Sequence, residues 1–459
     1  MSSVLHPTVA EREERGRAAR RSASRSSQSV LDLPPDRDPI ALLQAQDVTR
    51  VPDLVPIRYG RMLASPLTFL RGAAAVMAHD LADSASSGLI AQLCGDAHLL
   101  NFGGFATPER NLVFDVNDFD ETATGPFEWD VKRLAASFEV AGRARGFGRA
   151  DRKAAVLEGV RSYREAMRDF AGMGDLDVWY ARLDAPTIVE TLREEHDPKL
   201  VKVLKHEIAK ARAKDGRAAL GTLTHEIDGE PRLLSEPPLI VPLAELADAS
   251  AAEAIVQEGF RSYRSSLQPD RRLLLEQFRL GDIAHKVVGI GSVGTRCFVL
   301  LLFGRDDADP LFLQMKEAHS SVLWSSRSSN HGERVVQGQH LMQAASDVFL
   351  GWVRIERDMD GEQRDFYVRQ LLDWKVSLDV ETLLPHGLVR YASACGWTLA
   401  RAHARSGDRI AIASYLGASE RFDRAIEAFA VAYADLTERD HAALVQAAVN
   451  GRVTAVEGV

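Results

Sequence analysis

Residues 283–318 read IAHKVVGIGSVGTRCFVLLLFGRDDADPLFLQMKEA, and this stretch decides the fold. Three runs rich in aliphatic and aromatic residues predict three β-strands joined by turns, at 283–292, 295–304 and 309–318. The polar residues 304–309 suit the tip of a hairpin. The stretch therefore predicts a small antiparallel sheet rather than alternating strands and helices.

The glycines of this stretch connect one strand to the next. Gly289, Gly291 and Gly294 form a G-x-G-x-x-G pattern with Ser292 inside it. A Rossmann dinucleotide site needs a helix after its glycines, so the strand that follows argues against that site. The pattern favours a glycine-rich loop whose backbone N–H groups approach phosphate oxygens, as in a phosphoryl-transfer site. A flexible hairpin is the alternative.

Lys316 lies in an otherwise apolar strand. A buried ammonium is costly unless anions surround it, and nucleotide phosphates with a carboxylate would supply them. Glu333, at the start of the next predicted helix, is the preferred partner, and Glu317 is the second choice. A lysine that faces water from an edge strand is the alternative.

Two polar loops lie almost 200 residues upstream of Lys316. Asp96 and Asn101 belong to the loop GDAHLLN at 95–101, which follows a predicted strand at 89–94. Asp118 and Asp120 follow a second short strand at 112–116. Carboxylate and amide oxygens suit Mg²⁺, which keeps several waters and needs few protein ligands. Singly these residues are ordinary turn formers, but together they predict a metal and catalytic site.

The rest of the chain is mainly helical, so the fold class is α+β. Helices are expected at 66–83, 128–142, 251–267, 332–348, 388–405, 419–436 and 440–449, and further strands at 349–356 and 364–372. We expect a disordered basic tail at 1–36, a helical lobe with the two loops at 37–275, a β-rich nucleotide-binding lobe at 276–375, and C-terminal helices at 376–459 that pack on the helical lobe.

Composition excludes several classes of protein. The formal net charge of −9 disfavours general binding to nucleic acid or an anionic membrane. The three cysteines form no C-x-x-C pair, so a zinc knuckle or a disulfide framework is not indicated. No apolar run has the length of a membrane span, and residues 11–29 lack the apolar core of a secretion signal. A cytoplasmic location is the resulting expectation.

Three motifs together resemble the kinase superfamily, closest to its aminoglycoside phosphotransferase and choline kinase branch. The loop of Asp96, His98 and Asn101 is similar to a D-x-H-x-x-N catalytic loop, Asp118-Phe119-Asp120 to a metal motif, and Trp129-Asp130-Val131 to a later helix start. The resemblance implies ATP and Mg²⁺ as cofactors, Asp96 as base, Asn101 and Asp118 as metal ligands, and Lys316 with Glu333 as the phosphate-positioning pair. It also implies a structural Asp130 and an adenine-contacting hinge at residues 369–372, which include Arg369, Gln370 and Leu371.

The chain departs from that branch in two respects. Cys94 stands where a histidine usually precedes Gly-Asp, and the glycine-rich loop follows the catalytic loop instead of preceding it. A circular permutation of a two-lobed kinase-like fold, with extra helices, accounts for the reversed order. Either the helix at 388–403 or that at 66–83 would pack beside the catalytic loop. Over residues 37–449 the sequence also resembles the bacterial domain of unknown function 2252, on strings such as GDAHLLNFG and VGIGSVGTRC.

The sequence thus predicts a Mg-ATP-dependent phosphotransferase acting on a hydroxyl of a small acceptor. Three alternatives stay open. The same pocket could hold ATP in the opposite sense and transfer AMP, or it could bind a nucleotide without turnover as a pseudokinase scaffold. A metallophosphoesterase is a weaker rival, because its two-metal site needs further His and Asp ligands that the motifs lack.

Overall fold

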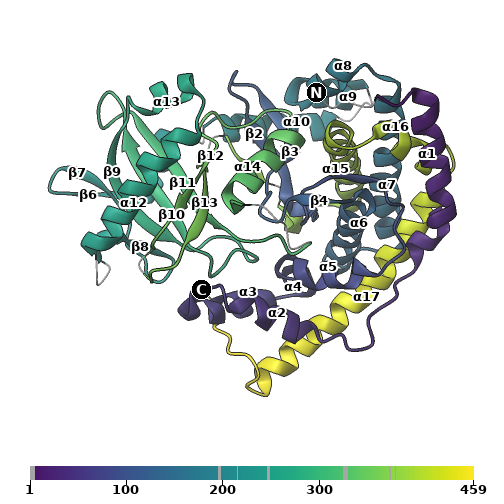
Figure 1. The fold of residues 1–459 in the computed structure, drawn as a ribbon, viewed down its shortest axis with the longest axis horizontal. Coiled ribbons are helices and arrows are strands. Elements are labelled where there is room, and N and C mark those ends of the chain that lie inside the picture. The colour runs from purple at the N-terminus through teal and green to yellow at the C-terminus, as the bar shows by residue number, and fades with distance from the viewer. Residues whose placement is uncertain are drawn as a thin grey trace.

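The computed structural model describes residues 6–194, 198–213, 216–245, 249–323, 329–358, 360–371, 374–377 and 379–458. The protein is a mixed α+β structure with several sheets. Figure 1 shows a six-stranded sheet at one end of the molecule and a mass of helices at the other, with α14 and the strands β2 and β3 between them. No helix in the described ranges has the length and apolar character that crossing a bilayer requires.

The six-stranded sheet is antiparallel throughout, in the order β12-β13-β11-β10-β9-β8. Its strands are β8 (Ile240–Pro242), β9 (Arg279–Lys286), β10 (Cys297–Phe303), β11 (Pro310–Ala318), β12 (Gly351–Ile355) and β13 (Arg364–Gln370). The second and third strands predicted from residues 283–318 are β10 and β11. The first, expected at 283–292, is β9, which begins earlier and ends at Lys286, before the glycines. Their register places Lys316 opposite Cys297 on one side and Tyr367 on the other.

Helices cover the sheet from residues that precede it in the chain. A core of buried side chains joins α12 (Ala249–Tyr263) and α13 (Pro269–Leu275) to the strands, and a second joins α11 (Gly216–Leu223) and the hairpin β6 (Thr224–Ile227)–β7 (Glu230–Leu233) to them. On the sheet thus pack α11, α12 and α13, which the sequence led us to place in the helical lobe. Helix α14 (His331–Met342) packs against β12 and β13 and contributes Val335 and Val336 to the core of the helical part.

The helical part is built around long helices from both halves of the chain. Buried side chains of α6 (Phe127–Ala144), α7 (Arg149–Gly172), α15 (Pro385–Ser406), α16 (Arg409–Leu416) and α17 (Arg421–Val449) form one core. The helices expected at 419–436 and 440–449 are a single helix, α17. Shorter helices complete this part: α2 (Pro39–Asp47), α3 (Val55–Leu63), α4 (Pro66–Gly72), α5 (Ala74–Ala82), α8 (Asp175–Tyr180), α9 (Ala185–Glu194) and α10 (Pro198–Arg212).

Short strands hold the predicted loops in place. β1 (Ile90–Leu93) pairs with β4 (Ala123–Pro126), and β2 (Phe102–Ala106) pairs with β3 (Leu112–Val116). β14 (Val376–Ser377) and β5 (Leu183–Asp184) extend the second pair to four strands. The loop at 94–101 runs from β1 to β2, and the loop at 117–122 runs from β3 to β4. Both loops therefore leave the same pair of small sheets.

The N-terminal residues are ordered, so the expectation of a disordered tail at 1–36 is wrong for the part that the structure describes. α1 (Val9–Ser22) begins with a capping box in which the Thr8 side chain accepts from the Glu11 N–H. The helix packs on α16, and Arg12 pairs with Asp408 at 2.8 Å. The segment reads as disordered in the sequence because its contacts are polar, while its apolar content is low.

Candidate active site

Asp130 holds the first loop from behind. Its carboxylate, on α6, accepts the backbone N–H groups of Cys94 at 2.8 Å and Gly95 at 3.1 Å, and His403 of α15 lies 3.3 Å away. Gly95 has a φ of +85°, and a Cβ there would lie 2.1 Å from the carbonyl oxygen of Glu121. This bracing role of Asp130 is the one that the resemblance implied, and it does not need the missing histidine at position 94.

Both helices that competed for the place beside this loop reach it. Tyr391 of α15 donates to the carbonyls of Leu99 and Phe102, at 2.8 and 2.9 Å. The segment expected as one helix at 66–83 is two helices, α4 and α5, separated at Ala73. The end of α4 approaches the loop through Arg133, which contacts the carbonyl of Leu70.

Asp96 is an ion-paired residue rather than a free base in this structure. The Arg133 guanidinium lies 2.7 Å from its carboxylate, and His98 Nε2 lies 3.7 Å away. Asn101 Nδ2 donates to the Asp96 carbonyl at 2.8 Å, which closes the loop. Burial lowers the pKa of His98 to about 4, although the Asp96 carboxylate opposes this. His98 is therefore neutral at pH 7, and it accepts the N–H of Leu100 through Nδ1.

The second loop brings two carboxylates together. The Asn117 N–H donates to the Asn101 carbonyl at 2.8 Å, so the two loops are tied directly. Asp118 Oδ1 accepts the N–H of Asp120 at 3.2 Å. Burial and the adjacent Asp120 carboxylate raise the pKa of Asp118. Burial opposes ionisation of Asp120 as well, but Lys316, Tyr367 and Arg369 together lower the pKa of Asp120. Two neighbouring, partly buried carboxylates suit a site that a cation completes.

Lys316 enters this site from β11. Its ammonium is buried, contacts the Asp120 carboxylate and donates to the Ser292 hydroxyl at 2.6 Å. Tyr367 on the neighbouring strand β13 donates its hydroxyl to the other oxygen of Asp120 at 2.7 Å. Burial opposes the charge, but the Asp120 carboxylate raises the pKa of Lys316. The sequence therefore identified the lysine correctly as buried, but its anionic partner is Asp120.

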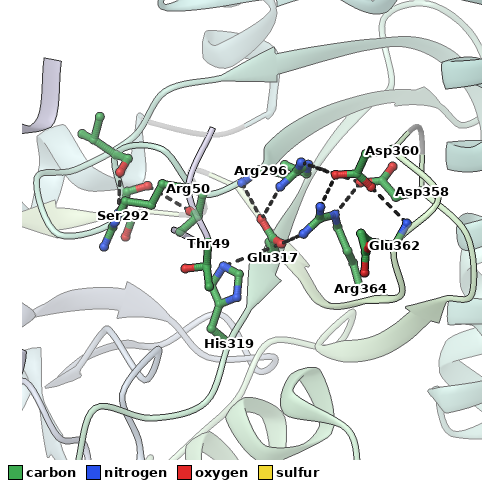
Figure 2. Close-up of polar contacts among 12 residues, drawn as sticks. Thr49, Arg50, Ser292, Arg296, Glu317, His319, Asp358, Asp360, Glu362 and Arg364 are labelled. Carbon is green, nitrogen blue, oxygen red and sulfur yellow. Dashed lines mark hydrogen bonds and ion pairs between the residues drawn. The ribbon is translucent and has the colours of Figure 1, made fainter. Parts of the chain in front are cut away.

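Neither glutamate expected to pair with Lys316 does so. Glu333 accepts from Gln337 within α14 at 2.9 Å. Glu317 faces the opposite side of β11, where Arg364 lies at 3.0 Å, Arg296 at 3.5 Å and His319 at 3.6 Å. Figure 2 shows this cluster continuing through the arginines to Asp358 and Asp360. Through Glu317, this cluster of ion pairs fixes Arg296, two residues after Gly294, to β11.

The glycine-rich segment is docked on the N-terminal helices. Gly289 and Gly294 have φ angles of +68° and +91°, a backbone region that favours glycine. The Gly294 carbonyl accepts from the Val51 N–H at 2.8 Å, and the Gly289 carbonyl accepts from Arg61 at 2.6 Å. Ile290 is buried in a core formed by α2, α3, α4 and α17. The segment is therefore a packed cover rather than an open hairpin.

A cavity of about 1190 Å³ lies between these elements. Eight of the residues proposed from the sequence line it: Asn101, Asp118, Gly289, Ser292, Lys316, Arg369, Gln370 and Leu371. Asp96, His98, Asp120, Gly291, Gly294 and Glu333 are not among its lining residues. The expected hinge residue 372 lies outside the described ranges. Arg369 bonds Gln314 Oε1 at 3.0 Å and the Asn117 carbonyl at 3.1 Å, so it ties β13 to the second loop.

The sequence missed other lining residues. The cavity is also lined by Arg71 on α4, Lys286 on β9, Gln339 on α14 and Gln343 at the C-terminal cap of α14. None of them belongs to a recognisable motif, and Arg71 stood only within a predicted helix. Within the described ranges, no group of three or more His, Cys, Asp and Glu side chains is arranged to hold a metal.

A family model described as an uncharacterized protein conserved in bacteria (DUF2252) matches residues 50–447. The chain belongs to this family. The matched residues of this DUF2252 protein include both polar loops, the glycine-rich segment, Lys316 and the hinge, but not α1. No curated protein and no solved structure matches the chain.

Proposed function

We propose that this protein is a Mg-ATP-dependent phosphotransferase that acts on a hydroxyl group of a small acceptor, through a kinase-like fold whose lobes follow each other in permuted order. One observation carries the proposal: Lys316 lines the same cavity as Asn101 and Asp118. Lys316 lies on β11, the third strand when β9, which precedes the glycine-rich segment, is counted as the first. Protein kinases combine a glycine-rich loop, a third-strand lysine, and an Asp and an Asn that hold Mg²⁺.

The residues fit an oxygen-ligated magnesium ion. Asp118 and Asn101 would hold it from the two tied loops, with Asp120 beside them. Two carboxylates and an amide are too few for an all-protein cage, and Mg²⁺ typically completes its shell with phosphates and water. When bound, the ion would neutralise charge on the phosphates, and Lys316 would contact them after leaving Asp120.

The proposed transfer forms one bond and breaks another. The acceptor oxygen forms a bond to the γ-phosphorus, and the bond from that phosphorus to the bridging oxygen breaks, so that ADP leaves with the electron pair. The acceptor proton passes to the Asp96 carboxylate, which Arg133 orients. The glycine-rich segment, which accepts hydrogen bonds from Val51 and from Arg61 of α3, would exclude water from the phosphoryl group.

Asp96→Ala and Asp118→Ala test the assignment. Both are expected to abolish turnover of ATP with an acceptor, and Asp118→Ala is expected to weaken Mg-ATP binding in calorimetry as well. Wild-type ATP consumption by both variants would refute the proposal. Mass spectrometry of the modified acceptor separates the addition of a phosphoryl group from the addition of AMP.

A nucleotide-binding scaffold without turnover is the second candidate, and two ion pairs in the site favour it. Asp96 is engaged by Arg133, and Asp120 is engaged by Lys316. A scaffold would bind Mg-ATP, as a thermal-shift assay would record, without turnover on any acceptor.

A further inference from the structure

Arg71 is an arginine without a partner at the edge of the proposed site. It lies in the last turn of α4, is half-buried and lines the cavity. Among the described residues it has neither a hydrogen bond nor an ion pair, and its Nε is fully enclosed without an acceptor. Burial lowers the pKa of Arg71, while the nearby carboxylates of Asp96 and Asp118 oppose the shift.

The surroundings of Arg71 show where it lies in the site. Its backbone carbonyl oxygen lies 3.3 Å from the position that a Cβ on Gly291 would take, so the end of α4 lies under the tip of the glycine-rich segment. Arg71 lines the same cavity as Asp118, and the carbonyl of the preceding residue, Leu70, accepts a hydrogen bond from Arg133, which is paired with Asp96. Arg71 therefore lies between the glycine-rich cover, the proposed base and the proposed metal ligand, which is where a transferred phosphoryl group would have to lie.

The energetics favour a ligand as its partner. A guanidinium taken from water without an anion or hydrogen-bond acceptors destabilises the fold. The nearest base, Asp96, is already paired with Arg133. A phosphate offers several acceptor oxygens, and two of them can accept hydrogen bonds together from the planar fork of donors on a guanidinium. An unpaired arginine kept at this place is therefore best explained by an anion that enters the cavity.

We propose that Arg71 binds the terminal phosphoryl group of a nucleoside triphosphate and stabilises its charge during transfer. This inference rests on the proposed function. Arg71 donates hydrogen bonds to the γ-phosphoryl oxygens and keeps its own protons, while the bond to the acceptor oxygen forms and the bond to ADP breaks. It plays the part that an arginine finger plays in other phosphoryl-transfer enzymes.

Nucleotide discrimination tests the proposal without knowledge of the acceptor. Calorimetry with the full chain compares Mg-ATP with Mg-ADP for wild type and Arg71→Ala. Loss of charge-assisted hydrogen bonds should weaken ATP binding roughly 10-fold to 100-fold and leave ADP binding unchanged. Arg71→Lys, which keeps the charge but not the fork of donors, should lose part of the preference for ATP.

Arg145→Ala is the matched control. Arg145 lines the same cavity and also has a buried Nε without a partner. Arg145 is the C-terminal cap of α6 and lies 12 residues beyond Arg133. At 1.5 Å per residue, this is about 18 Å along the helix axis. Its removal takes one positive charge from the cavity without touching the γ-phosphoryl position. Both affinities should therefore stay at wild-type values.

The outcomes distinguish the role of Arg71 from the proposed function on which it rests. Equal losses of ATP and ADP affinity in Arg71→Ala would overturn the role, because the contact would then be to an inner phosphate, as AMP transfer would require. Unchanged discrimination would also overturn it. If wild type binds neither nucleotide, the proposed function itself falls. Thermal unfolding of Arg71→Ala should occur at or above the wild-type temperature, since the variant loses a desolvated cation. If Arg71→Ala does not fold, Arg71→Lys decides by its ATP-to-ADP ratio.

Discussion

The pair formed by Lys316 and Asp120 joins residues 196 positions apart and links the sheet to the second polar loop. The side chain of Lys316 is 4% exposed and that of Asp120 is 25% exposed. Two neutral replacements, Lys316→Met and Asp120→Asn, keep the approximate volume and remove one charge each. We expect each to destabilise the protein, because each leaves the opposite charge with little solvent and without its partner.

The size of the effect follows from burial. Removing one member of a fully buried ion pair costs about 3–5 kcal/mol. Lys316→Met leaves Asp120 with its bonds to Tyr367 and Ser292 and with some solvent, so a loss of about 2–3 kcal/mol is expected. Asp120→Asn leaves an almost fully enclosed ammonium, so its loss should be about 3 kcal/mol or more. The double variant should lose little more than Asp120→Asn alone, which gives a coupling energy of about 2–3 kcal/mol.

Urea unfolding of the four proteins at pH 7, followed by tryptophan fluorescence, measures this coupling. A coupling energy below about 0.5 kcal/mol would refute the reasoning, because contacts of this kind are then energetically independent. The same cycle at saturating Mg-ATP adds a functional reading. If Lys316 moves to the phosphates, the coupling to Asp120 should fall. A coupling that is unchanged in tightly bound Mg-ATP would contradict the role proposed for Lys316.

Three further variants test the supports of the site. Asp130→Ala removes a buried carboxylate that accepts two backbone N–H groups, so urea unfolding should show a loss of about 3 kcal/mol, and a loss below 1 kcal/mol would contradict the bracing role. Burial opposes ionisation of Glu317, but the nearby His319 and the hydrogen bond from the Arg296 N–H lower the pKa of Glu317 from 4.5 to about 2. A lowered pKa stabilises the folded state above pH 4.5, and that gain is lost as the pH falls towards 2. The stability difference between wild type and Glu317→Gln should therefore shrink from about 3 kcal/mol at pH 7 to near zero at pH 2, and a constant difference would contradict the ion cluster. Gly294→Ala places a methyl group 3.0 Å from the Arg50 side chain at a φ of +91°, and should lower stability by about 1–2 kcal/mol in the same assay. Wild-type stability of that variant would show that the segment is not docked as described.

Local signals carried most of the fold that the sequence predicted. The strands at 283–318 are runs of apolar residues bounded by glycine and aspartate, and they appear as β9, β10 and β11. The two polar loops were found because each follows a short apolar strand. Their mutual contact, through Asn117 and Asn101, follows from the pairing of β2 with β3, which the intervening hairpin makes local.

The partner of Lys316 could not be read from the sequence, because it depends on the rotation of α14 about its axis. Successive residues of a helix point about 100° apart. Arg334, not Glu333, faces the second loop, where it donates to the Asp120 carbonyl at 2.8 Å. It also donates to the carbonyl of His319, just after β11, at 2.7 Å. The helix was predicted correctly, but only tertiary packing decides which of two adjacent residues turns inward.

The ordered N-terminus was missed for a different reason. Composition measures apolar content, whereas α1 is held largely by long arginine side chains that reach backbone carbonyls. Arg20 donates to the Tyr415 carbonyl at 3.0 Å, and Arg25, just beyond the helix, donates to the Leu416 carbonyl at 2.8 Å. Such contacts satisfy the C-terminal carbonyls of α16 and cover apolar surface with methylene groups. No local pattern in the sequence signals them.

Arg71 shows the same limit at the site itself. It lies 25 residues before Asp96 and belongs to no motif, yet it faces that carboxylate and the glycine-rich segment more than 200 residues later. Order along the chain is a weak constraint on such a site, because the entropy of closing a loop grows only as the logarithm of its length. Each doubling of loop length adds only about 0.6 kcal/mol. A chain that places its polar loops before its lysine can therefore assemble the same cavity as one that places them after it, provided that each strand and loop forms locally. In the proposed permuted order, α2, α3 and α4 precede the polar loops, and they pack against the glycine-rich segment with the end of α4 at Arg71 close to Gly291.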